Sequence, residues 1–362
     1  MSKAGPRFPV PAAETWYMIC NNSEEWRFDM PASGRGARVR VSACLLCCMC
    51  WSVGAQPAPA QTSSQRDEEF LAVYQKAQPI TNWPLKKLLH AFPELKGLRR
   101  DESQASLSAL LSGVAKNLEI FRKEFPNLAS LETIDESRVP DTYTADTLAL
   151  SGVAPVQSPP RDTDREKFRY LMLAGPSNGG LTEYRTDLHG HEEHATPQTI
   201  FVKTIGFVTL PFFFAADSQR LSDFRYLGSQ TVVDHPCQVV AFAEHVEPQA
   251  VRGRLTVGMY AIPLIMQGIA WIDPALNQIV RIRADLLAPQ PGAHFTQLTT
   301  VALFEPVKFQ SRPTTLWLPK EVHVTLDSQD YTYENHHRYA DYQLFNVETQ
   351  QTVEAPKPDN PE

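Results

Sequence analysis

The chain has 362 residues, of which 43% are hydrophobic, so it is long enough and apolar enough to bury a sizeable core. The formal net charge is −7 at pH 7 and lysine and arginine form no long run, which argues against nucleic acid as a partner. Cys237 is the only cysteine after residue 50, so the chain beyond that point has no intramolecular disulfide.

A segment with the features of a secretory signal peptide occupies residues 30–55, with its core from Arg35 to Ala55. Three arginines give it a positive start, an apolar stretch of 13 residues follows at 41–53, and small residues precede a cleavage site near Ala55. The stretch is shorter than the roughly 20 residues of a membrane-spanning helix. We expect translation to start at Met30, residues 1–29 to be a mis-assigned start, and the mature chain to be exported (periplasmic or secreted) without a transmembrane segment.

Two other interpretations of this segment stay open. It could be a buried helix of a cytoplasmic protein, or Cys44 could be a lipid-attachment site, although the apolar stretch follows Cys44 instead of preceding it. Four cysteines crowd together here without acidic or histidine partners, so they do not predict a metal site. They are Cys44, Cys47, Cys48 and Cys50.

Residues 56–65 predict a flexible spacer, because they are rich in proline, alanine, glutamine and serine. Residues 66–126 predict a helical region, because apolar residues recur there at helical spacing in three segments. The stripes are Phe70, Val73, Tyr74 and Ala77; Leu85, Leu88, Leu89 and Phe92; and Leu107, Leu110, Leu111, Val114, Leu118 and Phe121, the last ended by Phe125-Pro126.

From about Leu131 the apolar period changes to two, and residues 127–348 predict antiparallel strands with a Pro-rich loop at 153–160. Three hairpins are expected: 168–172 with 181–186, 224–233 with 237–243 through a turn at 234–236, and 268–272 with 278–286. Three more strands are expected at 297–309, 316–326 and 331–347, the last with a bulge. In segment 278–286 the pattern puts Val280, Ile282 and Ala284 on a buried face and Arg281, Arg283 and Asp285 on a wet one. Residues 349–362 predict a disordered tail.

Several strand and turn segments resemble the repeated hairpins of a known superfamily. They are 224–228 (FRYLG), 268–273 (GIAWID), 278–281 (QIVR) and 316–322 (LWLPKEV). The region from Leu107 to Val347 resembles bacterial lipoprotein-carrier-like proteins, the LolA/LolB and RseB-like superfamily, and a large group of uncharacterised exported bacterial proteins. The resemblance implies an α+β fold, in which a curved antiparallel sheet, a half-open β-barrel, wraps on helices around an apolar cavity for acyl chains. Here the fold would also carry a helical N-terminal extension.

This chain departs from the short carriers in its long helical region and in an unusually apolar insert from Ile205 to Ala216. The insert is either a buried element that plugs the sheet or the wall or lip of a cavity that meets lipid or a partner. The resemblance carries over no binding residue. Our candidate ligand-binding residues are therefore the large apolar side chains Phe207, Leu210, Phe212, Phe213, Phe214 and Trp271.

Polar candidates are weaker. His189, His191 and His194, with Glu192 and Glu193 between them, could hold Zn²⁺ or Cu²⁺, although a solvated loop is the simpler interpretation. Gly175-Pro176-Ser177-Asn178-Gly179 matches the nucleophile-elbow string, but a strand follows it where the motif requires a helix. His336 and His337, beside Tyr331, Tyr333, Tyr339 and Asp341, form a polar and aromatic strand that could bind a ligand or simply pack.

The sequence thus predicts no catalytic residue and no cofactor. Our leading hypothesis is a non-enzymatic exported protein that binds an apolar small molecule, a lipid or an envelope protein. The alternatives are a structural or interaction protein with a filled barrel, and an exported metal-dependent hydrolase.

Overall fold

The computed structural model describes residues 16–20, 63–140, 161–174, 181–191, 203–251, 253–257, 260–310, 312–328 and 331–345. The predicted signal peptide, most of the spacer, the loop at 153–160 and the tail at 349–362 lie outside these ranges. Within them, no helix is both long and apolar enough to cross a membrane.

The three helices predicted in the N-terminal region are present. They are α1 (Ser63–Tyr74), α2 (Leu85–Ala91) and α3 (Leu107–Glu124). Pro84 stands directly before α2, and α3 ends where Phe125 takes an extended conformation ahead of Pro126. Short elements that the apolar pattern did not indicate lie between them: η1 (Ile80–Asn82), η2 (Pro93–Leu95) and β2 (Arg99–Arg100).

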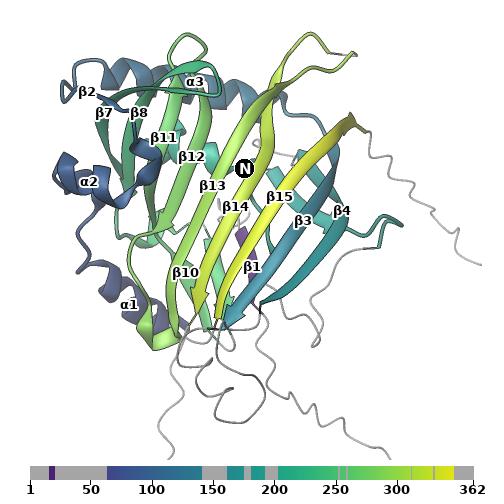
Figure 1. Ribbon diagram of the computed structural model, residues 1–362, viewed down its shortest axis with the longest axis horizontal. Coiled ribbons are helices and arrows are strands. Elements are labelled where there is room, and N and C mark those ends of the chain that lie inside the picture. The colour runs from purple at the N-terminus through teal and green to yellow at the C-terminus, as the bar shows by residue number, and fades with distance from the viewer. Residues whose placement is uncertain are drawn as a thin grey trace, which may run out of the picture.

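An antiparallel sheet of eleven strands forms the body of the molecule (Figure 1), in the order β2-β7-β8-β11-β12-β13-β14-β15-β3-β4-β5. The first long strand of the chain, β3, pairs along its length with the last, β15. The bounds are β3 Leu128–Pro140, β4 Asp162–Ala174, β5 Leu181–Thr186, β7 Ser222–Val232, β8 His235–Glu244, β11 Met266–Asp273, β12 Gln278–Leu286, β13 Phe295–Val307, β14 Leu316–Ser328 and β15 Tyr331–Leu344.

The sheet is curved but not closed. Its edge strands are β2 and β5, and no pairing joins them among the described residues. The prediction of a curved antiparallel sheet on helices is thus confirmed, whereas the barrel is an open sheet.

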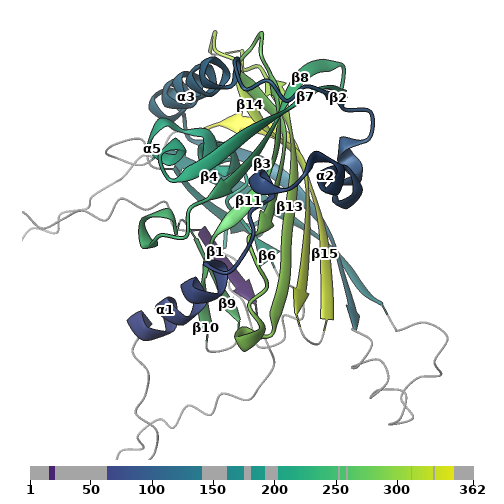
Figure 2. The same ribbon diagram turned by 90° about the vertical axis from the view of Figure 1, so that its left-hand side faces the viewer.

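A smaller sheet has the order β10-β9-β1-β6, with β1 at Trp16–Cys20, β6 at Lys203–Thr204, β9 at Gly253–Val257 and β10 at Tyr260–Leu264. Figure 2 shows β9 and β10 on the same side of the large sheet as α1, α3 and α5 (Ala216–Gln219). We call this side the inner face and the opposite side the outer face.

The inner face carries the main hydrophobic core. The stripe of α3, formed by Leu110, Val114 and Leu118, packs there together with residues 204–215, which we call the inner segment. The inner segment contains the turn η3 (Leu210–Phe214). Two further turns, η4 (Pro248–Ala250) and η5 (Pro291–Ala293), connect strands.

A second core covers part of the outer face, over β7, β8, β11 and β12. Strand β8 serves both cores by alternation, with Val240 and Phe242 in the first and Val239 and Ala241 in the second. The cover comes from residues 80–95, which contribute Ile80, Leu88, Phe92 and Leu95.

The prediction of a wet face on β12 is therefore wrong. Arg283 bonds to Glu94 at 2.6 Å and lies over the Phe92 ring, so the helical region covers this face. Val280 is also on the outer side instead of beside Ile282, because a bulge between Trp271 and Ile272 leaves it out of the pairing register.

Two other details concern turns. The hairpin of β7 and β8 turns through Val233 and Asp234, both with positive φ, which is one residue earlier than expected. The bulge predicted in β15 is present between Ala340 and Gln343, where Asp341 has a φ of 55°.

Candidate functional site

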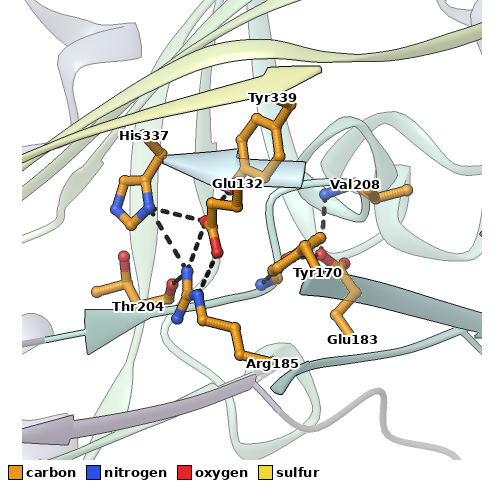
Figure 3. Close-up of polar contacts among 9 residues, drawn as sticks. Glu132, Tyr170, Glu183, Arg185, Thr204, Val208, His337 and Tyr339 are labelled. Carbon is orange, nitrogen blue, oxygen red and sulfur yellow. Dashed lines mark hydrogen bonds and ion pairs between the residues drawn. The ribbon is translucent and has the colours of Figure 1, made fainter. Parts of the chain in front are cut away.

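A cluster of polar side chains is buried on the inner face, where β3, β4, β5 and β15 lie side by side (Figure 3). Strand pairing brings them together, because Glu132 lies opposite Tyr339 and Tyr170 lies opposite Arg185. All are on the inward side of their strands and are buried. The polar cluster consists of Glu132, Tyr170, Glu183, Arg185, His337 and Tyr339.

Glu132 is the centre of the first half of the polar cluster. Arg185 donates to both of its oxygens, with the Nη2 bond to Oε1 at 2.8 Å. Tyr339 donates its hydroxyl to Oε1 at 2.6 Å, and Nδ1 of His337 lies 2.9 Å from the same atom. Burial by itself would raise the pKa of Glu132, but the Arg185 guanidinium and the hydrogen bonds outweigh it and lower that pKa to about 2.

These pKa shifts fix the protonation states of the first half. Burial lowers the pKa of His337, even though Glu132 favours its charged form, so the ring is neutral and Nδ1 carries the proton that it donates. Burial would lower the pKa of Arg185, but the attraction of Glu132 raises it. The first half is thus an ion pair with a neutral histidine and a neutral tyrosine attached.

Glu183 is the centre of the second half. Tyr170 donates its hydroxyl to Oε2 of Glu183, and the backbone N–H of Val208 donates to the same oxygen at 3.3 Å. No cation is bonded to Glu183 among the described residues, and burial raises its pKa. The rings of Tyr170 and Tyr339 meet edge to face at 5.3 Å and connect the two halves.

The polar cluster binds the beginning of the inner segment. Arg185 donates Nη2 to the carbonyl of Thr204 at 2.5 Å, and the N–H of Gly206 donates to the Tyr170 hydroxyl at 3.3 Å. With the Val208 bond, three backbone groups within five residues are satisfied by side chains of β4 and β5. The side chains therefore give the backbone of a buried loop the partners that it needs away from water.

The polar cluster supports the inner segment through hydrogen bonds to its backbone. Glu132 accepts four hydrogen bonds, three at Oε1 and one at Oε2, so most of its acceptor capacity is used within the polar cluster. Glu132 and His337 are both 0% exposed, so a substrate has no access to either of them.

The structure brings together five of the six residues predicted to bind a ligand. Phe207, Leu210, Phe212, Phe213 and Phe214 all belong to the main core, where each is at most 5% exposed. Trp271 does not join them, because it belongs to the second core on the outer face and donates its Nε1 hydrogen to Gln230.

The five residues are close-packed. Phe213 stacks on Phe242 with ring centroids 5.0 Å apart, and Phe212 meets Phe121 edge to face at 6.2 Å. A pocket between α3, Pro211 and Trp317 has a volume of about 20 Å³. This volume holds about one water molecule and no acyl chain.

The predicted histidine site is a turn in the part that the structure describes. Asp187 accepts from the backbone N–H groups of His189 and His191 and from the His191 ring at 2.9 Å. These bonds account for the turn without a metal. His194, Glu192 and Glu193 lie outside the described residues, as does the string at 175–179.

The histidine pair at 336–337 is divided by strand alternation. His337 joins the polar cluster with Tyr339, whereas His336 lies on the outer face. Sequence reasoning named His337 but missed its partners. A signal was available on β3, since Leu128, Glu132 and Ile134 have the same parity and put a carboxylate on an apolar face. On β5, Glu183 and Arg185 likewise have the same parity as Leu181, so they put charged groups on an apolar face.

Comparison with known proteins finds no matching family model and no matching curated protein. Among solved structures, a DUF1329 family protein from Desulfovibrio piger ATCC 29098 is similar, with 8% identity, a TM-score of 0.34 and coverage of 66% of this chain and 92% of that one. A putative outer membrane lipoprotein-sorting protein domain from Vibrio parahaemolyticus is similar with 12% identity, a TM-score of 0.33 and coverage of 68% and 95%. The resemblance to lipoprotein-carrier-like proteins thus has a counterpart among solved structures.

Proposed function

We propose that the mature chain is an exported, non-enzymatic protein that binds an apolar ligand on its inner face, in the place that β1 takes in the full chain. The observation that carries this proposal is the origin of β1. Residues 16–20 precede the predicted signal peptide, yet they form a strand between β9 and β6. A start at Met30 or cleavage near Ala55 would each leave them out of the mature chain.

The place of β1 is apolar on the side of its neighbours. Met18 pairs with Leu255 of β9, which in turn pairs with Ile262 of β10. Leu255 and Ile262 are both fully buried members of the main core. The sequence of β1 itself, Trp-Tyr-Met-Ile-Cys, is apolar throughout.

Loss of β1 would leave two kinds of group without a partner. The edges of β9 and β6 would be unpaired and would need new hydrogen-bond partners, and Leu255 would lose Met18 as its neighbour across the strand pair. A lipid chain would cover the apolar side chains. An extended apolar segment of an envelope protein would cover them and also pair with the two strand edges.

The non-enzymatic part of the proposal rests on the polar cluster, whose groups are bonded to one another and to the inner segment. The alternative of a filled structural or interaction protein is supported by the close packing of Phe207, Leu210 and Phe212–Phe214. The two hypotheses differ in what fills the place of β1 in the mature chain.

Binding to the full chain and to a chain beginning at Gln56 tests the proposal. Two probes are titrated, a fluorescent fatty acid and a synthetic peptide of residues 13–23. We expect the shorter chain to bind at least one probe in the micromolar range and the full chain to bind it at least tenfold more weakly, because β1 competes.

A matched pair of variants locates the probe. Leu255→Asp in the shorter chain should abolish binding, whereas Leu276→Asp should leave it unchanged, because Leu276 is an exposed turn residue. Circular dichroism checks that both variants fold. If a folded shorter chain binds neither probe, the apolar-ligand proposal is rejected in favour of the filled interaction protein.

A further inference from the structure

Three potential metal ligands lie together on the outer face of β14 and β15. His323 and His336 are directly opposite each other in the strand pairing, and Glu321 is two residues from His323 on the same side of β14. Strand alternation and register thus put all three side chains on one surface. The site is separate from the inner face and independent of the function proposed above.

The three groups are close enough to share an ion. Their ligand atoms all lie within 4.8 Å of one another, and His336 Nε2 is 3.5 Å from Glu321 Oε2. Around a tetrahedral zinc ion, with ligand bonds of about 2.0–2.2 Å, donor atoms are about 3.3 Å apart. Small side-chain rotations would close the difference, and Glu321 and His323 are free to make them because neither is fully buried.

The state of the imidazoles suits a metal. Their rings are stacked, with centroids 3.9 Å apart and planes at 17°. Nε2 of His336 is buried and makes no hydrogen bond to any residue that the structure describes. A pair of nitrogen donors with one carboxylate is a set that zinc accepts.

The surroundings leave room for the remaining ligands. His323 and His336 border an open polar groove of about 820 Å³, which Asp135, Arg165 and Glu334 also line. Water from this groove can complete the coordination of an ion held by three protein ligands, as at zinc sites that keep an open position.

Arg338 opposes metal binding in the present arrangement. It donates Nη1 to His336 Nδ1 at 3.3 Å, so Nε2 carries the ring proton, and it donates Nη2 to Asp135 at 2.5 Å. A metal on Nε2 moves the ring proton to Nδ1, where it would face the guanidinium. Arg338 then has to turn away from His336 while it keeps its bond to Asp135.

We propose that Glu321, His323 and His336 form a zinc site on the outer face, with Arg338 as a neighbour that weakens it. The test uses the full chain without a histidine tag, freed of metal by a chelator and titrated with zinc chloride in a calorimeter. We expect one zinc ion per chain. His323→Ala and His336→Gln should each weaken binding at least 100-fold, while His191→Ala should leave it unchanged as the loop control.

Arg338→Gln gives the sharper test, because the proposal requires it to tighten zinc binding by about tenfold. A surface histidine pair that binds zinc adventitiously would not respond in this way. Thermal unfolding without metal checks that the variants fold. The proposal is overturned if zinc does not bind, if the two histidine variants bind it as well as the parent chain, or if Arg338→Gln leaves the affinity unchanged.

Discussion

The two ends of the inner segment are held by different means. Its beginning, residues 204–209, is held by hydrogen bonds between side chains of the polar cluster and the backbone of Thr204, Gly206 and Val208. Its end, residues 210–215, is fixed by aromatic packing, in which Phe214 touches both Phe224 and Phe242. Close packing stabilises a segment by filling the space around its side chains. Hydrogen bonds also require a particular distance and direction between two groups, so they fix the position and register of the backbone. We therefore expect the apolar end to dominate stability and the polar end to dominate positioning.

Phe214→Asp gives the largest expected effect and tests the apolar end. The side chain is 0% exposed, so the change loses aromatic contacts and buries an unpaired carboxylate. Removing a phenylalanine from a core costs about 3–5 kcal/mol even as alanine, and the charge adds to this. Denaturant unfolding followed by circular dichroism should show loss of the cooperative transition. Leu276→Ala, on an exposed turn, should stay within about 0.5 kcal/mol of the parent chain.

Glu132→Gln tests the polar end and ranks next. It leaves the buried Arg185 guanidinium without its anion, which typically costs about 3–5 kcal/mol in unfolding free energy. Arg185→Met should cost a similar amount of unfolding free energy, because it leaves the buried Glu132 carboxylate without its cation. The double variant should cost clearly less than the sum of the two, because it removes both charges. Additive costs would show that the ion pair is not a unit.

The pH dependence of stability separates the two carboxylates of the polar cluster. The folded-state pKa of Glu132 is about 2, below its unfolded value, so its contribution is present above about pH 4.5 and is lost as the pH falls towards 2. Burial raises the pKa of Glu183, so its contribution has the opposite sign and is lost as the pH rises through the folded value. Glu183→Gln should therefore make stability at pH 8 more favourable relative to pH 5 than in the parent chain. Glu132→Gln should instead flatten the loss of stability below pH 4.5, and identical pH profiles for the two variants would contradict these assignments.

Cys237 gives the smallest expected effect and serves as a control outside the inner face. It is 1% exposed in the second core, and burial raises the pKa of its thiol to about 12. In a chain beginning at Gln56 it is the only thiol. We expect iodoacetamide to label it only as the protein unfolds, so the labelling rate should rise in Phe214→Asp and not in Leu276→Ala. Fast labelling of the native parent chain would contradict a closed second core.

The sequence was sufficient to predict most of the helices and strands, but not which of them pair or pack with one another. The three apolar stripes predicted α1, α2 and α3, and alternation predicted most strands, because both signals are local. The pairing of β3 with β15 was missed, since it joins residues about 200 positions apart. For the same reason, the cover of β12 by residues 80–95 and the meeting of Glu132 with Arg185 and His337 could not be predicted. Apolar content put the five side chains of the inner segment, which lie together in the main core, into one group with Trp271, which lies in the second core. Hydrophobicity alone does not tell one face of a sheet from the other.

Native mass spectrometry tests the central claim most directly, which is that the mature chain carries an apolar ligand where β1 lies in the full chain. The protein is purified from its own envelope fraction, its N-terminus is determined, and bound molecules are released and identified. We predict a chain that begins near Gln56 or Gln61, with a lipid or an apolar peptide bound at about one per chain and displaced by the peptide of residues 13–23. A processed, folded chain that carries no bound molecule and binds none would contradict the account.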